Sequence, residues 1–298
     1  MFTSTTQPPT QLPSPLQVIE PDWRHAEDYR ITVKRDDLIH PVISGNKWRK
    51  LRHLDKNLLP NIKGTVASFG GGYSNHLHAL SFCCKQYGVQ NIAFIRGNYT
   101  GNETPMIKDL MHWGTHIVYL SKVDYSLRDR DEYLTTLSRQ YDIELLLPEG
   151  GSHADHLAGL QGLHDEFTAP VDHLILPVAS GGTLAGLAVS TGNIRNLLGI
   201  AVLKGQDYLE SLVTQLVAER HINTPYTIAH DYSLNGYAKS TPELDRFCID
   251  TENQLGLPVE PVYSGKVLFA LKTLIENRAF TPGSTLAFLH TGGLQGAR

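Results

Sequence analysis

Cysteine is scarce in this chain, with three residues among 298. Cys83 and Cys84 are neighbours that cannot readily bridge each other, and Cys248 alone adds no disulfide framework. The scarcity excludes a fold held together by disulfides. It predicts a protein of the reducing cytoplasm.

Long apolar runs and an excess of positive charge are also absent. No run of about 18 apolar residues occurs, so the sequence predicts no membrane-spanning helix. The formal net charge is −4 and the pI is near 6.4, so we expect no affinity for nucleic acid or for an anionic membrane surface. Met1–Leu16 holds neither a basic residue nor an apolar block, so we expect a loose arm along another element or a partner subunit, not a secretory signal.

What is present is an ordinary soluble composition, 41% hydrophobic and 19% charged, in a chain long enough for one large domain or two ordinary ones. Short β-branched runs alternate with amphipathic stretches along almost the whole length. We expect strands at Ile31–Val33, Thr65–Phe69, Asn91–Arg96, His116–Leu120, Glu144–Leu147, His173–Val178, Gly199–Leu203, Thr227–Ala229 and Thr285–His290. We expect helices at Lys47–Leu58, Ser74–Tyr87, Thr104–Trp113, Leu127–Tyr141, His156–Phe167, Thr183–Leu197, Tyr208–Glu219, Pro242–Leu255 and Gly265–Asn277.

The order of these segments predicts an α/β fold. Single helices between strands imply right-handed crossovers and parallel sheets that helices cover on both faces. This many units would make one very wide sheet, so we predict two packed domains, each with an open, twisted and mostly parallel sheet. No low-complexity linker is present, so we expect the chain to cross between the domains by short connections.

A lysine follows a small, glycine-containing turn in Ser44-Gly45-Asn46-Lys47. A helical pattern begins here, and the amino terminus of a helix carries unpaired N–H donors and a partial positive charge. An ammonium group is disfavoured there, so Lys47 is easier to hold neutral, the form that attacks an aldehyde to make a Schiff base. A solvated surface lysine is the alternative, and this motif alone does not decide.

Three glycines, Gly70 to Gly72, come directly after the predicted strand Thr65–Phe69 and let the backbone approach a ligand closely. Ser74 or Asn75 then opens a helix whose N–H groups suit a carboxylate or a phosphate. No Gly-Lys-Ser/Thr follows, so this is not a Walker loop. A tight strand–helix turn with a serine cap is the alternative.

A third glycine-containing segment, Ala179–Thr183, follows the most apolar predicted strand and opens a helix without charge in its first two turns. The hydroxyls of Ser180 and Thr183 and the N–H groups of Gly181, Gly182 and Thr183 are suited to surround a phosphate. The loop lacks arginine and lysine, which suits a permanently held phosphate monoester better than a triphosphate in transfer. Close helix–sheet packing through glycines is the alternative.

The three segments are more specific together than any one of them. A lysine after a turn, a seat for an anion and a cradle for a phosphate are the minimum equipment for pyridoxal phosphate. All three stand at strand–helix junctions, the rim where open α/β sheets bind ligands.

These segments resemble those of the fold-type-II (tryptophan synthase β-like) pyridoxal-phosphate enzymes, in the branch of 1-aminocyclopropane-1-carboxylate deaminase and D-cysteine desulfhydrase. The resemblance runs from about Val33 to Gly293. Its landmarks are Lys34-Arg35-Asp36-Asp37, Ser44-Gly45-Asn46-Lys47, Gly71-Gly72-Tyr73-Ser74-Asn75-His76, Pro148-Glu149-Gly150-Gly151, Ser180-Gly181-Gly182-Thr183, Pro261-Val262-Tyr263-Ser264-Gly265-Lys266 and His290-Thr291-Gly292-Gly293.

The resemblance implies a role for each matching residue. Lys47 would be the Schiff-base lysine, Lys50 would contact the cofactor phosphate, and Asn75 would hydrogen-bond the 3′ oxygen of the cofactor. The substrate carboxylate would be held by Ser74, Asn75 and His76, and the phosphate by Ala179, Ser180, Gly181, Gly182 and Thr183. It also suggests a homodimer. We predict a large cofactor-binding domain of residues 1–52 and 160–298 and a small α/β domain of residues 53–159.

Two tyrosines, Tyr237 and Tyr263, match tyrosines that face the substrate in this family. A phenol near a cationic imine loses its proton more easily and can serve as acid, base or attacking group. Buried tyrosines that only pack are the alternative. With Lys47 and Ser74, these tyrosines complete the predicted catalytic set.

Two residues depart from the deaminase pattern. Ser264 stands where that pattern places a glutamate that reaches the pyridine nitrogen of the cofactor, and His76 replaces a glutamine. A neutral hydroxyl at residue 264 can leave the nitrogen unprotonated, which weakens carbanion storage and favours prompt loss of a β leaving group. The desulfhydrase pattern also has a hydroxyl residue there.

Other chemistry is less well supported by the sequence. His76 and His78 cannot share one helical face, and no nearby carboxylate pair completes a metal site, so no metal is predicted. Cys83 and Cys84 lie in mid-helix, where inert apolar packing is expected.

The sequence thus predicts a pyridoxal-phosphate enzyme that acts on a small amino acid. The expected reaction is α,β-elimination from D-cysteine or a similar β-substituted D-amino acid, giving a 2-oxo acid, ammonia and, from D-cysteine, hydrogen sulfide. One alternative is 1-aminocyclopropane-1-carboxylate deamination to 2-oxobutanoate and ammonia. Others are a non-catalytic protein that binds pyridoxal phosphate and a hydrolase that uses the glycine-rich loops for another anion.

Overall fold

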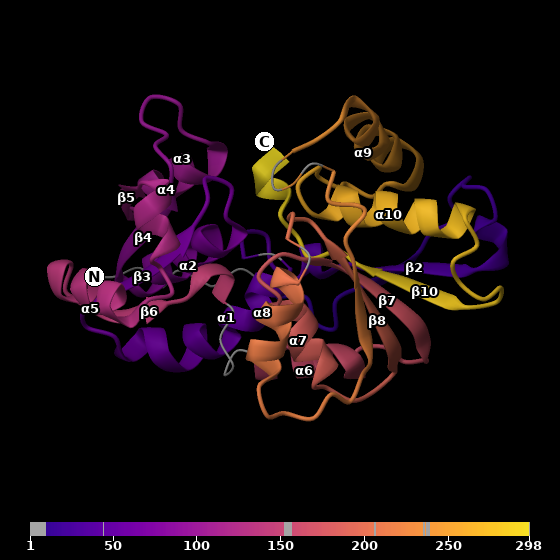
Figure 1. Cartoon of the computed structure of the whole chain (residues 1–298), viewed down its shortest axis with the longest axis horizontal. Helices are drawn as coiled ribbons and strands as arrows, with labels where there is room; N and C mark the ends of the chain where they lie inside the picture. Colours follow the sequence, from indigo (N-terminus) through magenta and orange to yellow (C-terminus); the bar gives the residue numbers. More distant parts are fainter. Residues whose placement is uncertain are drawn as a thin grey trace.

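The structure is a computed structural model, and it describes residues 10–43, 45–151, 157–205, 207–234, 236 and 239–297. These residues form two open sheets, one of six strands and one of four. Figure 1 shows the two sheets in separate halves of the molecule, each with helices packed on it.

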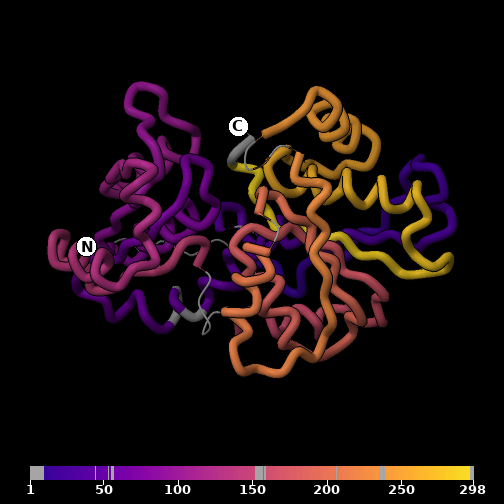
Figure 2. Tube along the Cα trace, viewed as in Figure 1, coloured from indigo at the N-terminus to yellow at the C-terminus, as the bar shows by residue number. Residues whose placement is uncertain are grey.

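The six-stranded sheet has the order β1-β2-β10-β7-β8-β9, and all its pairs are parallel except β1 with β2. Its strands are β1 (Leu16–Val18), β2 (Arg30–Lys34), β7 (Val171–Val178), β8 (Ile194–Ala201), β9 (Tyr226–Ala229) and β10 (Thr285–Leu289). β2 and β10 come from opposite ends of the chain and pair directly, as the indigo and yellow segments side by side in Figure 2 show. The large half therefore needs both ends of the chain.

Both faces of this sheet are buried because successive side chains of a strand point to opposite faces. Ile175 and Phe288 pack against α9 and α10, whereas their neighbours Leu174 and Leu289 pack on the other face, among residues of α6, α7 and α8. The bounds of these helices are α6 (Ala158–Asp165), α7 (Gly182–Ala188), α8 (Tyr208–Val217), α9 (Pro242–Leu255) and α10 (Ser264–Glu276). A parallel sheet covered in this way presents its ligand-binding edge at the strand ends.

The four-stranded sheet has the order β5-β4-β3-β6 and is parallel throughout. Its strands are β3 (Thr65–Gly70), β4 (Gln90–Arg96), β5 (His116–Leu120) and β6 (Ile143–Leu147). The helices of this half are α1 (Asn46–His53), α2 (Asn75–Tyr87), α3 (Pro105–His112), α4 (Lys122–Ser126) and α5 (Asp131–Gln140). Val66 packs with α1 and α2, while Phe69 and Phe94 pack on the opposite face with Tyr125 and Leu137 of α4 and α5.

The predicted fold class, two open and mostly parallel sheets with helices on both faces, is confirmed. The predicted domain boundaries stay a prediction. α1 begins the connection between the two halves and packs against α6, where a Cβ on Gly159 would lie 2.2 Å from the carbonyl oxygen of Arg49. The lysine-bearing helix is therefore held tightly against the large half.

Several segments differ from the sequence prediction, among them the strand expected at Gly199–Leu203, which is β8 and begins at Ile194. The helix expected at Thr183–Leu197 ends at Ala188; Gly192 (φ +150°) follows, and the chain then enters β8, which pairs with β7. The helix expected at Leu127–Tyr141 begins only at Asp131, and α4 was not predicted.

The amino-terminal arm differs as well. Its described part lies along another element, as expected, but it is not loose. Gln11 donates its N–H to Ile39 O, Ser14 is buried, and Leu16 already begins β1 beside β2.

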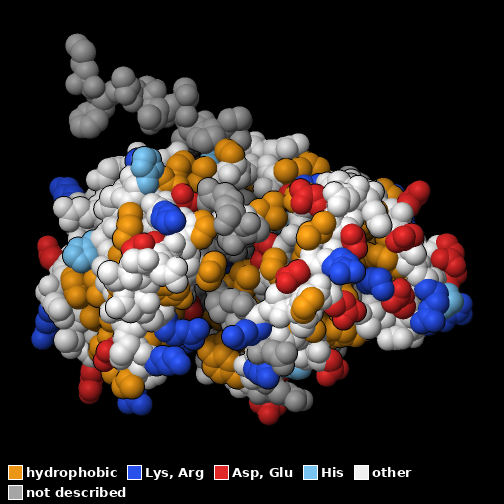
Figure 3. Space-filling view, turned by 90° about the horizontal axis from the view of Figure 1, so that it is seen from above, with side chains coloured by type: hydrophobic (Ala, Val, Ile, Leu, Met, Phe, Trp, Pro, Cys, Tyr) orange, Lys and Arg blue, Asp and Glu red, His pale blue; other side chains and the backbone are white. Residues whose placement is uncertain are grey.

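The surface charges and the helix lengths agree with the near-neutral charge balance and the lack of long apolar runs in the sequence. The face shown in Figure 3 carries acidic and basic side chains side by side. Within the described ranges, no helix is long and apolar enough to cross a membrane. Cys83, Cys84 and Cys248 form no disulfide and have buried side chains, as expected for Cys83 and Cys84.

Candidate active site

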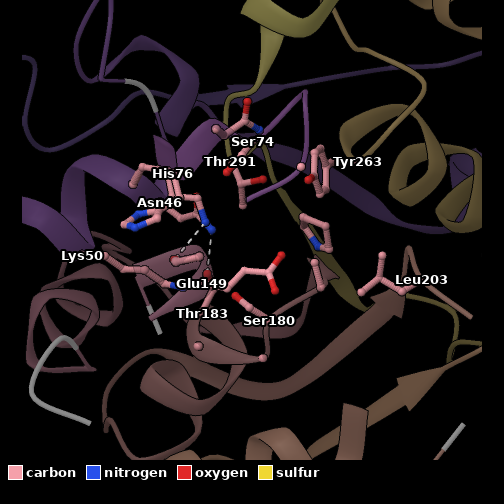
Figure 4. A pocket seen from close by; sticks show the side chains of 18 of the residues that line it. Asn46, Lys50, Ser74, His76, Glu149, Ser180, Thr183, Leu203, Tyr263 and Thr291 are labelled. Carbon is pink, nitrogen blue, oxygen red and sulfur yellow. Dashed lines mark hydrogen bonds between the residues drawn. The ribbon is translucent and has the colours of Figure 1, made fainter. Parts of the chain in front are cut away.

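A pocket lies where the carboxyl ends of strands from both sheets face each other. Residues 71, 96 and 149 reach it from the ends of β3, β4 and β6, and residues 179, 203 and 291 from the ends of β7, β8 and β10. It is lined by Asn46, Lys47, Lys50, Gly71, Ser74, Asn75, His76, Arg96, Tyr125, Arg128, Glu149, Gly150, Pro177, Ala179, Ser180, Gly181, Gly182, Thr183, Leu203, Tyr263 and Thr291. Figure 4 shows His76, Asn46 and Lys50 on one side and Tyr263 and Leu203 on the other.

Lys47 reaches the pocket from the first turn of α1. The helix starts after Gly45, whose φ of +65° favours glycine and where an added Cβ would lie only 1.7 Å from the carbonyl oxygen of Thr291. The Lys47 ammonium nitrogen Nζ donates to Gly150 O at 3.4 Å. The turn predicted from the sequence therefore does place this lysine in the pocket, although Ser44 lies outside the described residues.

The two pocket lysines have lowered pKa values. Burial lowers the pKa of Lys47 from 10.5 to about 8, against the opposing effect of the Glu149 carboxylate. Burial and the nearby Lys47 charge lower the pKa of Lys50 well below its usual value. A lysine with a pKa near 8 is about one-tenth neutral at pH 7, roughly 300-fold more than a lysine at 10.5, and the neutral amine is the nucleophile.

The predicted anion seat lies at the start of α2. Ser74 is the N-cap, and its Oγ accepts the N–H of Leu77 at 3.3 Å. Asn75 Oδ1 accepts a hydrogen bond from the side chain of Gln295, near the carboxyl terminus, so its amide NH₂ remains the donor end. The N–H groups of the first turn and this amide are suited to hold a carboxylate.

His76 is fixed by the strand beneath it. Its Nε2 lies 2.9 Å from Ser68 Oγ, and that hydroxyl donates to Leu147 O at 3.0 Å. Since the hydroxyl proton is used there, Ser68 accepts from His76, so the ring carries its proton on Nε2. Gly151 packs closely on the ring, because a Cβ there would lie 2.9 Å from it.

The predicted phosphate cradle faces this seat from the large half. Ala179 through Thr183 line the pocket, and Gly181 caps α7 with φ +72°. Thr183 Oγ1 accepts from Asn46 Nδ2 at 2.7 Å, a contact drawn as a dashed line in Figure 4. This hydrogen bond joins the start of α1 to the start of α7, so the lysine and the cradle are positioned together.

The start of α10 brings Tyr263 into the pocket but not Ser264. The Ser264 hydroxyl accepts the N–H of Glu260 at 2.9 Å and donates to Glu260 Oε1 at 3.1 Å. Burial raises the pKa of Glu260 to about 7, although its carboxylate accepts three backbone N–H groups of this turn. Ser264 is fully buried beside the pocket wall, and its proposed role toward a pyridine nitrogen stays a prediction.

Tyr237 lies outside the described residues. The loop before it is held by Lys266, whose Nζ donates to Ser233 O at 2.9 Å and to Gly236 O at 2.7 Å. No sequence pattern singled out Glu260, and Lys266 stood out only as part of a family motif.

Four charged or phenolic pocket residues were also not predicted: Arg96, Tyr125, Arg128 and Glu149. Arg128 Nε lies 2.7 Å from Glu149 Oε2. Glu149 belongs to the landmark Pro148-Glu149-Gly150-Gly151, to which the resemblance gave no chemical role. For Arg96, the available signal was its position at the end of a predicted strand.

Comparison with known proteins decides the family. The model of the family described as "Pyridoxal-phosphate dependent enzyme" matches residues 9–292. The chain belongs to this family. Pyridoxal phosphate is therefore its cofactor, and the protein is a pyridoxal-phosphate-dependent enzyme of fold type II, as predicted.

Individual relatives carry two activity names. The chain is 28% identical over 303 residues to a Thermotoga maritima protein provisionally named a 1-aminocyclopropane-1-carboxylate deaminase, covering 95% of both chains. It is 27% identical over 304 residues to a D-cysteine desulfhydrase of Klebsiella pneumoniae strain 342, covering 94% of this chain and 92% of that one. A crystal structure described as an ACC deaminase homologue superposes with a TM-score of 0.79 at 26% identity, covering 98% of this chain and 93% of that one.

The pocket fits the cofactor of the family. An aldehyde needs a neutral amine, which Lys47 supplies, and a phosphate needs N–H and hydroxyl donors without a carboxylate among them, which Ala179 to Thr183 supply. Lys50 adds a cation once a phosphate stabilises its charged form. Among the side chains that the structure describes, no cluster of three or more His, Cys, Asp and Glu could hold a metal ion.

Proposed function

We propose that this enzyme is a lyase that removes the β substituent of a small amino acid, with D-cysteine or a similar β-substituted D-amino acid as substrate. With D-cysteine and one water, the products are pyruvate, ammonia and hydrogen sulfide. The observation that carries the proposal is the placement of Lys47, with its pKa near 8, in one pocket with the carboxylate seat at the start of α2. The name of the Klebsiella relative supports it.

The residues divide the work of the reaction. Pyridoxal phosphate, when bound, supplies an electron sink for the pair left by the α proton. Ser74, Asn75 and the N–H groups of α2 orient the amino acid through its carboxylate. The Lys47 amine, about half of it neutral at pH 8, takes the α proton from Cα. The β substituent then leaves with the electron pair of its bond to Cβ.

Deamination of 1-aminocyclopropane-1-carboxylate is the second candidate. It is favoured by the name of the Thermotoga relative and by Tyr263, which lines the pocket. Elimination is preferred because residue 264 is a serine. The side chain of residue 264 therefore offers no carboxylate to the pyridine nitrogen of the cofactor. The carboxylate of Glu260 is not among the residues that line the pocket, and it accepts the N–H and the hydroxyl of Ser264 instead.

The test is product release from purified holoenzyme. We expect ammonia and a 2-oxo acid from D-cysteine, and little of either from 1-aminocyclopropane-1-carboxylate. Turnover of the cyclopropane compound alone would reverse the preference. A bound cofactor without ammonia release from any of a broad panel of D- and L-amino acids would mean a non-catalytic binding protein.

The covalent site is tested separately. Borohydride reduction of the holoenzyme, digestion and peptide mass analysis should place the cofactor on Lys47. Lys47→Arg should abolish both the cofactor attachment to this peptide and the elimination activity. The control Lys63→Arg, at an exposed position of the small half, should leave the attachment and the activity unchanged.

We also propose a cytoplasmic location and a homodimer with no nucleic-acid or membrane partner. Three buried cysteines that form no disulfide support a reducing location. Cell fractionation and light scattering of the purified protein test the two statements.

A further inference from the structure

The small half contributes two guanidinium groups to the pocket. Arg96 is the last residue of β4, and Arg128 follows α4, the helix after β5. Tyr125 of α4 lies between them in sequence and also lines the pocket. Nothing in the proposed elimination of a neutral thiol uses these arginines.

Both arginines lie against one phenol ring. The guanidinium carbon of Arg128 is 4.9 Å from the centre of the Tyr125 ring, and that of Arg96 is 5.7 Å from it. Tyr125 is 3% exposed, and burial with the nearby Glu149 raises its pKa, so the phenol stays neutral and cancels neither charge. Holding two like charges near one ring is unfavourable unless an anion balances them.

Protein carboxylates balance only part of this charge. Glu149 Oε2 lies 2.7 Å from Arg128 Nε, and the largely exposed Asp129 lies 3.7 Å from the same guanidinium. Among the residues that the structure describes, Arg96 has no ion-pair partner, and its side chain is exposed at the pocket. Arg96 is therefore the cation most available to a ligand.

The position of this cluster separates it from the other anion seats. The phosphate cradle lies on the large half, at the start of α7, and the carboxylate seat lies at the end of β3. In the order β5-β4-β3-β6, the arginines follow the strands next to β3 on one side. Neighbouring strands are about 4.8 Å apart, so the cluster lies roughly 5–10 Å from the seat, the reach of an extended amino-acid side chain.

We propose that Arg96 and Arg128, held on Tyr125, form a subsite for an anionic group at the end of the substrate side chain. The preferred substrate would then be an amino acid whose β substituent ends in a carboxylate or a similar anion. This inference rests on the proposed function, because it assumes that an amino acid is seated by its carboxylate at α2.

A matched pair of substrates isolates the charge. S-carboxymethylcysteine and S-carbamoylmethylcysteine have nearly the same shape, and only the first ends in an anion. In each, elimination breaks the Cβ–S bond, the sulfur leaves as a thiol, and water converts the remainder to pyruvate and ammonia. We expect kcat/KM for the acid, in the preferred enantiomer, to exceed that for the amide by about tenfold, the size of one charge-assisted contact.

Variants of Arg96 identify the source of the preference. Arg96→Gln should bring the acid-to-amide ratio about tenfold down, towards one, whereas Arg96→Lys should retain most of it. The control Arg195→Gln changes an exposed arginine of β8 that pairs with Asp172, and it should leave the ratio as in the parent. An unchanged ratio in Arg96→Gln, or no preference in the parent enzyme, would overturn the proposal.

A binding measurement keeps this test separate from that of the proposed function. Both compounds are titrated into holoenzyme while the visible absorbance of the bound cofactor is followed, which gives a dissociation constant without turnover. If no amino acid releases ammonia, the proposed function fails, but a tighter constant for the acid that is lost in Arg96→Gln still supports the subsite. Equal constants for acid and amide would refute it.

Discussion

At the scale of single residues, the chemistry depends on how little water surrounds the Lys47 amine. Burial lowers its pKa to about 8, and Glu149 limits the shift. The sequence located this lysine because the motif is local: a glycine turn and a helix start lie within four residues of it. The same was true of Ser74 and of Ala179 to Thr183, which also line the pocket.

The unpredicted residues depend on contacts that no local pattern reveals. Arg96, Arg128 and Glu149 look like ordinary charged residues at element ends, and only the packing of β4, α4 and β6 brings them to one pocket. Ser264 shows the converse case. Its position in the motif was recognised. The hydrogen bonds of its hydroxyl to Glu260, four residues earlier, were not predicted from the sequence.

The lowered pKa of Lys47 predicts how the apoprotein captures its cofactor. Only the neutral amine attacks the aldehyde, so the capture rate should rise with pH and level off above about 8. Glu149→Gln removes the charge that raises this pKa, so the plateau should begin at lower pH. Stopped-flow absorbance over a pH series measures both, with Glu219→Gln, at an exposed position, as the control. A rate still rising towards the usual lysine value of 10.5 would contradict the prediction.

At the scale of elements, the start of α1 is set by one backbone conformation. Gly45 has φ +65° and leaves no room for a Cβ against Thr291, so α1 can begin at Asn46 only with glycine there. Boundaries of this kind were predictable where glycine or a capping residue marked them, as at Ser74 and Thr241. The end of α7 was missed although polar residues and Gly192 follow it, because the apolar residues of β8 (Ile194, Leu197 and Leu198) continue the helical pattern.

Gly45→Ala should therefore displace Lys47. Alanine at positive φ costs about 1–2 kcal/mol before any collision with Thr291 is counted, so the apoprotein should lose at least that much stability. Cofactor affinity should fall as well, because the lysine moves relative to the cradle. Urea unfolding and cofactor titration measure the two effects. Gly162→Ala is the matched control: its Cβ meets open space in α6, and alanine there should be neutral or stabilise by up to about 1 kcal/mol. Equal stabilities of the two variants would refute the argument.

At the scale of the whole molecule, a buried ionic network joins the lysine-bearing helix to the large half. Arg49 of α1 pairs with Asp36 through Nε at 2.7 Å and with Glu166 through Nη1 at 2.7 Å. Lys34 of β2 pairs with Glu166 at 2.8 Å. Sequence reasoning found the two sheets from strand and helix periodicity, but it could not find this network, because its members lie up to 132 positions apart, from 34 to 166.

The network predicts an acid-dependent loss of stability. Arg49 and Lys34 lower the pKa of Glu166 from 4.5 to about 2, against burial. A carboxyl group whose pKa is lower in the folded than in the unfolded protein stabilises the fold at any pH above its unfolded pKa. This contribution is lost as the pH falls from about 4.5 towards 2. Glu166→Gln should cost on the order of 2 kcal/mol or more near pH 7, since it leaves a buried cation poorly paired. Urea unfolding should show the difference in stability between the parent and Glu166→Gln shrinking as the pH falls from about 4.5 towards 2. A deficit that is constant with pH, or equal to that of Glu219→Gln, would contradict this.

The pocket between the two sheets predicts that the cofactor stabilises the molecule as a whole. A ligand that contacts Lys47 of α1 and the loop before α7 binds only when both halves are in place, so it adds to the free energy of unfolding. Removing pyridoxal phosphate should lower the melting temperature, and adding it back should raise that temperature with concentration. At a hundredfold excess over the dissociation constant, the cofactor should add about 2.7 kcal/mol to the free energy of unfolding. Lys47→Arg keeps the phosphate cradle but loses the covalent bond, so its melting temperature should rise less at each concentration. Calorimetry of the holo, apo and variant proteins measures these differences. Equal melting of the holo and apo forms would mean that the cofactor does not bridge the two halves.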